Sequence, residues 1–336
     1  MHVNRREFLR RTICAALGGA GLYSALGNLR LVAASVGARH PYTFSDYKAL
    51  VCVFLYGGND SFNTVVPVSG QARTDYVAAR GALALDGLQA LNPAAGGGPG
   101  NYGLHPSMPE LASLFNTGSA AIVANVGSLL YPITQAEYQD GSVPSPPQLF
   151  SHDDQSTQWQ TSRPDDANAN GWGGCIADLL ASANSGQVPM SLTLSGSNRF
   201  QRGAIVNPYA MDPSGVTRLN YSDDGPDSWI MGSDNTDGAT AYNALIAPDT
   251  QAHVLERAFA DATTRSIANY RLIASALAGA PVLTTPFPPD NDLAAQLQMV
   301  AQLISVRAAL GMSRQVFFVS TGNYDTHSDQ IVDQDS

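Results

Sequence analysis

The sequence predicts an α/β fold in which a central, mostly parallel sheet is flanked by helices. Residues 50–56 and 315–320 are apolar runs with β-branched and aromatic members and no charge, a pattern typical of strands buried in a parallel sheet. Residues 293–310 form an amphipathic helical pattern that comes directly before the second run. The 336 residues are 44% hydrophobic and 14% charged, with 31 Gly and 20 Pro, so we expect a loop-rich globular protein.

Helical periodicity and turn residues place the other elements. The segment 106–118 has Pro near its start and Gly at its end, as a helix requires, and the apolar run 120–126 after it predicts a second buried strand. Together they predict a parallel crossover unit. We also expect short strands over 190–194 and 204–206, and helices over 71–80, 151–161, 171–183 and 239–278, the last with a break at Pro248.

The N-terminus, residues 1–38, has the features of an export signal. Arg5 and Arg6 lie in the run NRREFLR, which resembles a twin-arginine (Tat) signal, and a mildly apolar stretch with small residues follows. The alternative is an ordinary basic N-terminal helix. We therefore expect the Tat export machinery as a partner and a mature chain, residues 39–336, in the periplasm or outside the cell. No apolar run elsewhere reaches the ~20 residues that span a bilayer, so no stable membrane span is expected there.

The charge of the chain limits its partners. The formal net charge is -10, and the five Arg and one Glu of residues 1–38 leave 13 basic and 27 acidic residues in the remainder. Because nucleic-acid binding depends on neutralising phosphates with cations, we do not expect a nucleic-acid partner. Cys52 and Cys175 lie in apolar surroundings and are expected to be structural thiols.

Polar residues follow both apolar runs where each predicted strand ends. Gly57 and Gly58 precede Asn59 and Asp60, and the second run continues into Asp325-Thr-His327. Because ligands of open α/β sheets bind at the carboxyl ends of the strands, we expect these side chains to converge there. Two carboxylates and an imidazole are suitable ligands for a divalent metal ion. The alternative for Asp60 is that it caps the next helix.

The chain resembles the DUF1501 family of bacterial proteins, which is usually placed in the alkaline phosphatase-like, or sulfatase-like, superfamily. The residues that carry the resemblance are the twin-arginine leader, FLYGGNDSFNTVVP, Tyr76–Arg80, YGLHPSMPELASLFNTGSAAIVANVG, SHDDQSTQWQT and LAAQLQMVAQLISVRAALGMSRQVFFVSTGNYDTHSDQ. The resemblance implies a single three-layer domain over residues 39–336. It also implies that further family segments, Ser-Glu-Phe-Gly-Arg and Asp-His-Gly, would follow His327, so we expect the last part of the fold to be missing here.

The resemblance further implies a hydrolase that uses a divalent metal ion (Zn, Ca or Mn) to cleave phosphate or sulfate esters, with a small anionic ester as substrate. Asp60, Asp325 and His327 match the metal ligands. Ser151 matches the nucleophile, because it opens a helix whose N-terminus favours anions, although a plain N-cap serine is the alternative. Asn59, His105 and His152 lie near these motifs as candidate substrate contacts, with Ser61 and Thr64 as weaker candidates for the nucleophile.

Two other interpretations remain open. Without the later family segments the metal site is incomplete, which favours a non-catalytic secreted binding or structural protein on the same scaffold. A serine esterase of the GDSL type is suggested by Gly57-Gly58-Asn59-Asp60, but the Gly-Asp-Ser block of that class is absent and one residue, not two, separates Asp325 from His327. The chain also has no Gly-x-Ser-x-Gly, phosphate-loop or dinucleotide-binding motif.

Overall fold

A computed structural model describes residues 44–92, 101–216, 244–247 and 251–335 of the chain. The expected export signal and the predicted helix break at Pro248 lie outside these residues. The chain divides into two compact units, which are described separately below. Unit 1 comprises residues 1–53 and 157–320, and unit 2 comprises residues 54–156 and 321–336.

The helices and strands follow one another in an α/β order. The strands are β1 (Lys48–Leu55), β2 (Val65–Pro67), β3 (Gln89–Ala90), β4 (Tyr102–Leu104), β5 (Ser191–Thr193), β6 (Tyr209–Ala210) and β7 (Arg314–Thr321). The helices are α3 (Ser61–Thr64), α4 (Gly70–Arg80), α5 (Pro109–Asn116), α6 (Gln135–Asp140), α7 (His152–Thr161), α8 (Trp172–Leu180), α10 (Val254–Ala278), α11 (Asp292–Ser305) and α12 (Gln330–Asp335), with short 3₁₀ turns η1 (Gly81–Leu83) and η2 (Ala181–Ala183).

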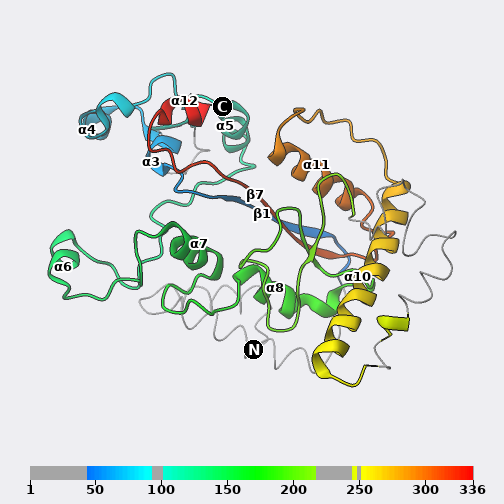
Figure 1. Ribbon diagram of the computed structural model, residues 1–336. Coiled ribbons are helices and arrows are strands. Elements are labelled where there is room, and N and C mark those ends of the chain that lie inside the picture. Colours follow the sequence, from blue (N-terminus) through cyan, green and yellow to red (C-terminus); the bar gives the residue numbers. More distant parts are fainter. Residues whose placement is uncertain (1–43, 93–100, 217–243, 248–250, 336) are drawn as a thin grey trace, which may run out of the picture. The chain divides into compact units, whose positions relative to one another are not determined.

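Unit 1 is built on a four-stranded parallel sheet with the strand order β1-β7-β5-β6. In Figure 1, α10 and α11 lie on one side of this sheet and α8 on the other. Phe317 and Val319 of β7 are fully buried and belong to the cluster that also contains residues of α10 and α11. Phe318 points to the opposite face, where its ring lies 5.8 Å from that of Phe200, which in turn contacts Trp172 of α8. The predicted α/β class is therefore confirmed at this level.

The position of β1 at the edge of the sheet corrects one expectation. The residues of β1 were expected to be buried on both faces, but none of them is fully buried and Val53 is 45% exposed. An edge strand has a partner on one side only, which leaves part of its apolar surface accessible. The strand over 314–321 is the one that is buried along most of its length.

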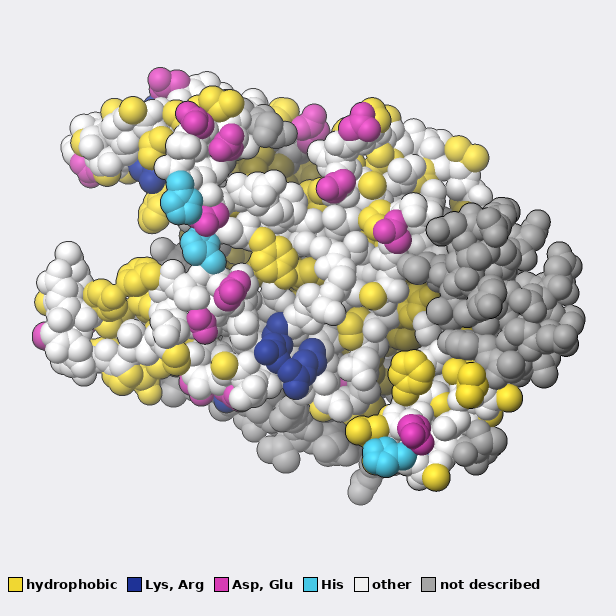
Figure 2. Space-filling model, viewed as in Figure 1, with side chains coloured by type: hydrophobic (Ala, Val, Ile, Leu, Met, Phe, Trp, Pro, Cys, Tyr) yellow, Lys and Arg dark blue, Asp and Glu magenta, His cyan; other side chains and the backbone are white. Residues whose placement is uncertain are grey.

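The described surface is acidic and has few basic groups. On the face shown in Figure 2, Asp and Glu side chains are spread over the surface and Lys and Arg side chains are few. Cys52 and Cys175 are of intermediate burial, and neither forms a disulfide with a described residue. Among the described helices none combines the length and hydropathy of a bilayer span.

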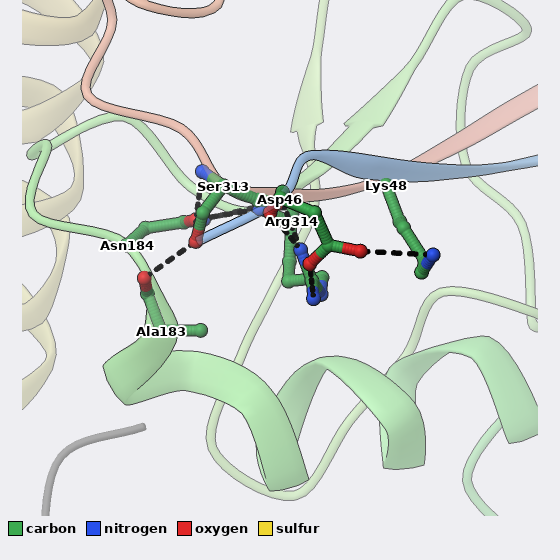
Figure 3. Close-up of polar contacts among 6 residues, drawn as sticks. All are labelled: Asp46, Lys48, Ala183, Asn184, Ser313 and Arg314. Carbon is green, nitrogen blue, oxygen red and sulfur yellow. Dashed lines mark hydrogen bonds and ion pairs between the residues drawn. The ribbon is translucent and has the colours of Figure 1, made fainter. Parts of the chain in front are cut away.

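A polar cluster fixes the start of β7 in unit 1 (Figure 3). The Arg314 guanidinium donates to the Asp46 carboxylate at 2.7 Å and to the Asp46 carbonyl at 2.6 Å. The Asn184 amide oxygen accepts from the backbone N–H groups of Ser313 and Arg314, both at 2.9 Å. The Arg314 hydrogen bond lowers the pKa of Asp46 to about 2, with a further contribution from Lys48. This cluster joins the segments that precede β1, β5 and β7.

Unit 2 contains a small antiparallel sheet with the order β2-β4-β3. Tyr76 of α4 joins this region through two buried hydrogen bonds. Its hydroxyl donates to the Asn63 amide oxygen and accepts from the Leu85 backbone N–H, both at 2.9 Å. The Asn63 amide nitrogen also donates to the Leu83 carbonyl at 3.0 Å, and Asn63 is only 1% exposed. Helix α4 is thereby held against α3 and the segment that follows η1.

Two predicted strands are wrong. The run 120–126 forms no strand, and Ile122, Val123 and Val126 are 40%, 78% and 54% exposed. Its β-branched composition favours a strand, but a strand also needs a hydrogen-bonding neighbour, and none of the described strands pairs with it. The predicted crossover unit is therefore not formed. Residues 204–206 form a turn, and the fourth strand of the sheet lies at Tyr209–Ala210 instead.

Candidate functional site

The turn after β1 packs closely against two other segments of unit 2. Gly57 and Gly58 have φ values of 104° and 90°, which residues other than glycine rarely adopt. A Cβ atom on Gly57 would lie 2.8 Å from the Asp325 backbone nitrogen, and one on Gly58 would lie 3.1 Å from His152 Cε1. The double glycine therefore allows the chain to turn where residues 325 and 152 approach it.

Backbone hydrogen bonds join the exits of β1 and β7. The Tyr56 N–H donates to the Thr321 carbonyl at 2.9 Å, and the Tyr324 N–H donates to the Tyr56 carbonyl at 3.3 Å. Asn323, with φ of 71°, turns the chain between these bonds. The predicted convergence of the two strand exits is thus present in unit 2.

Two imidazoles approach one carboxylate oxygen at this position. His152 Nε2 lies 3.7 Å from Asp325 Oδ1, and His327 Nδ1 lies 3.4 Å from the same oxygen. The three side chains are 54%, 50% and 86% exposed, in the order His152, Asp325 and His327. We call these three residues the histidine rim. Because the side chains are accessible, they can meet a substrate and exchange protons with it.

Ser151 caps helix α7 directly before His152. Its hydroxyl oxygen accepts from the Asp154 backbone N–H at 3.3 Å, which is the N-cap arrangement that was the alternative to a nucleophile. Ser151 is half-buried, and its own N–H donates to the carbonyl of Gln148 at 2.8 Å. Asp153 and Asp154 occupy the first turn of α7 and offset the attraction of the helix N-terminus for an anion.

The Asp60 carboxylate is engaged by protein groups. One oxygen accepts from the Phe62 N–H at 3.1 Å, so Asp60 is the N-cap of α3, as its alternative interpretation held. The other accepts from the Arg80 guanidinium and from the Gln330 amide, the latter at 2.6 Å. The side chains of Asp60 and Arg80 are only 13% and 22% exposed, which makes this a largely enclosed ion pair.

These contacts do not fit the metal centre that the resemblance implies. A metal ion at Asp60 would have to displace Arg80 and Gln330 from the carboxylate. It would also lie beside the Arg80 guanidinium, whose positive charge would repel it. The residues that the structure describes contain no group of three or more His, Cys, Asp or Glu side chains able to hold a metal ion. Asp325 and His327 lie together, but the Asp60 carboxylate binds Phe62, Arg80 and Gln330 and does not complete a metal site with them.

The other candidate residues differ in accessibility. Asn59 is half-buried in the turn after β1. His105 is 4% exposed, and its Nδ1 accepts from the Ser107 backbone N–H at 3.3 Å, so the ring is part of the loop before α5. His105 therefore fits a structural role better than contact with a substrate. Arg5 and Arg6 lie outside the described residues.

Sequence reasoning missed the two partners of Asp60. Arg80 lies within the run Tyr76–Arg80 that carries part of the family resemblance, so a basic partner for Asp60 could have been sought there. Gln330 offered no signal, because an amide 270 positions from its partner follows no local pattern. Comparison with protein-family models, with curated proteins and with solved structures found no match to this chain.

Proposed function

We propose that this protein is an exported hydrolase of phosphate or sulfate esters whose chemistry takes place at the histidine rim. The observation that carries the proposal is the approach of His152 and His327 to one oxygen of Asp325. A carboxylate next to an imidazole orients the ring, which suits general acid–base catalysis. Protonated imidazoles also attract the anionic oxygens of a small ester.

The proposed reaction uses groups of this chain alone. The Ser151 hydroxyl attacks the phosphorus or sulfur atom and passes its proton to one imidazole of the rim. The bond to the leaving oxygen breaks, and the other imidazole, in its protonated form, donates a proton to that oxygen. Water then attacks the ester of Ser151 with the proton transfers reversed, which releases phosphate or sulfate and restores the hydroxyl. Proton transfer of this kind contributes about 10²- to 10⁴-fold to a rate.

A divalent ion is a second part of the proposal. In place of the proton transfer by His327, Asp325 and His327 would supply two ligands for zinc, calcium or manganese, and the ion would polarise the ester. None of the steps above depends on it. Metal analysis of the purified full-length chain tests this part independently of activity. A protein that retains no metal, and whose activity is the same with and without added ions, would contradict it.

The test of the hydrolase is turnover of 4-nitrophenyl phosphate and 4-nitrophenyl sulfate by the full chain, with and without added Zn, Mn or Ca. We expect His327→Gln and His152→Gln each to lower kcat by about 10²-fold or more, because each removes one proton-transfer group. His253→Asn is the matched control, since His253 lies at the N-cap of α10 in unit 1 and Asn is also a good N-cap. Wild-type protein without turnover under any of these conditions would overturn the proposal.

The alternative is a secreted binding or structural protein on the same scaffold. It is favoured by the engagement of Asp60 with Arg80 and Gln330, which leaves that carboxylate unavailable for a metal ion. It predicts a stable, folded protein that turns over neither ester. The same assay, accompanied by circular dichroism to establish folding, distinguishes the two functions.

A further inference from the structure

Unit 1 contains a cavity that has no part in the proposed hydrolysis. Its volume is ≈ 360 Å³, within the range of pockets that bind small molecules. Three segments line it: the start of η2 with Asn184 and residues 186–190, the segment 205–207, and Arg265 of α10.

One wall of the cavity is fixed by helix α8. The Asp178 carboxylate accepts from the backbone N–H groups of Ala204, Ile205 and Val206 at 2.6, 3.0 and 2.8 Å. A Cβ on Gly203 would lie 2.5 Å from Asp178 Oδ1, so the chain must have glycine there to come this close. The turn 205–207 is therefore held in one conformation. The same bonds occupy the Asp178 carboxylate, so that it is not available to pair with a cation in the cavity.

The second wall is held against the turn between α11 and β7. The Ser185 and Gly186 N–H groups both donate to the Gly311 carbonyl, at 3.1 and 3.3 Å. A Cβ on Gly186 would lie 1.9 Å from the Leu310 carbonyl oxygen. Asn184 is fixed in turn by its bonds to Ser313 and Arg314 (Figure 3). These two walls are thus formed before any ligand arrives, which lowers the entropic cost of binding, while Arg265 is exposed and completes the site from α10.

Among the described residues that line the cavity, the only charged side chain is that of Arg265. Arg265 makes no hydrogen bond or ion pair within the described part of the chain, although the protein has 28 acidic and only 18 basic residues. Gln187 and Asn207 also line the cavity and carry amide groups that can donate hydrogen bonds. Val188 and Met190, each 4% exposed, provide an apolar surface beside these polar groups.

We propose that this cavity binds a small organic carboxylate. The planar guanidinium of Arg265 matches a carboxylate in a two-point hydrogen-bonded pair. The apolar body of the ligand would lie against Val188 and Met190, which a bare inorganic anion could not use. The site belongs to unit 1, whereas the histidine rim belongs to unit 2, so this inference does not depend on the proposed hydrolase.

The experiment is a calorimetric titration of the full-length chain with hexanoate, 1-hexanol and inorganic phosphate. We expect saturable binding of hexanoate, and about 10- to 100-fold weaker binding by Arg265→Gln, as for the loss of a hydrogen-bonded charged partner. Arg265→Lys keeps the charge without the planar fork and should be intermediate. Arg271→Gln is the matched control, because it removes the same charge from the same helix outside the cavity lining and should bind as wild type.

Each of the other outcomes contradicts the proposal. Hexanoate that shows no saturable binding, or that binds Arg265→Gln as tightly as wild type, overturns the site. Phosphate that binds more tightly than hexanoate and depends on Arg265 overturns the carboxylate class. Equal binding of 1-hexanol and hexanoate shows an apolar cavity without charge recognition and overturns the role of Arg265.

Discussion

Replacing Tyr76 by Phe tests the hydrogen bonds that hold α4 to α3 and to the segment after η1. The change removes one hydroxyl and leaves the Asn63 amide oxygen and the Leu85 N–H without the partners that now lie 2.9 Å away. A buried polar group left without its partner costs about 1–3 kcal/mol. Asn63 keeps its bond to the Leu83 carbonyl, so we expect a loss of about 2–4 kcal/mol in the stability of unit 2, below the sum of two maximal penalties.

Hydrogen exchange at the Leu85 amide is the most direct assay, because this N–H donates to the hydroxyl that is removed. A loss of about 2–4 kcal/mol corresponds to exchange faster by about 30- to 1,000-fold. Tyr138→Phe is the control, since Tyr138 is 44% exposed and its ring contacts Phe150 without needing the hydroxyl. We expect the control to change stability by at most ~0.5 kcal/mol. Equal exchange rates at Leu85 in Tyr76→Phe and in Tyr138→Phe would show that the Tyr76 hydroxyl does not stabilise this part of unit 2.

Three further predictions concern ionisable groups. Asp60→Asn and Arg80→Met should each destabilise the chain while the double variant recovers part of the loss, with a coupling of about 0.5–2 kcal/mol by urea unfolding; strictly additive effects would show that the pair does not interact. Burial raises the pKa of the Cys52 thiol to about 11, so its alkylation at pH 8, followed by peptide mass spectrometry, should be about 100-fold slower than for a thiol of pKa 9, and a rate equal to that of a free thiol would contradict this. Because the pKa of Asp46 is lowered, its contribution to stability is present above its ordinary pKa of 3.8 and is lost as the pH falls through about 2. The difference in urea midpoint between wild type and Asp46→Asn should therefore be constant above pH 4 and shrink below it. A difference that grows on acidification would contradict this prediction.

Long patterns in the sequence predicted the fold best. The strands over 48–55 and 314–321 and the helices over 70–80 and 292–305 have enough apolar or periodic residues to be recognised locally. The strands β2, β3, β4 and β6 have only two or three residues each, too few to show an alternating pattern. The run 120–126 shows the opposite case, since its composition favours a strand while pairing depends on a partner elsewhere in the chain.

Only part of the candidate site could be predicted from the sequence. Parallel strands bring their carboxyl ends to one edge, which predicted that the turn after β1 and the segment Asp325–His327 would meet. The orientation of individual side chains depends on specific partners, and Arg80 and Gln330 could not be assigned to Asp60 from spacing. His152 was a candidate substrate contact, but its approach to Asp325 follows from the packing of α7 against Gly58, which no local pattern encodes.

The proposed hydrolase depends on Asp325, whose carboxylate oxygen lies close to the imidazoles of His152 and His327. The most direct measurement is kcat for 4-nitrophenyl phosphate and 4-nitrophenyl sulfate with Asp325→Asn, which keeps the size of the side chain and removes its charge. We expect at least one ester to be turned over by wild type and kcat to fall by about 10²-fold or more in the variant, with folding unchanged by circular dichroism. Turnover by Asp325→Asn at the wild-type rate would contradict the claim.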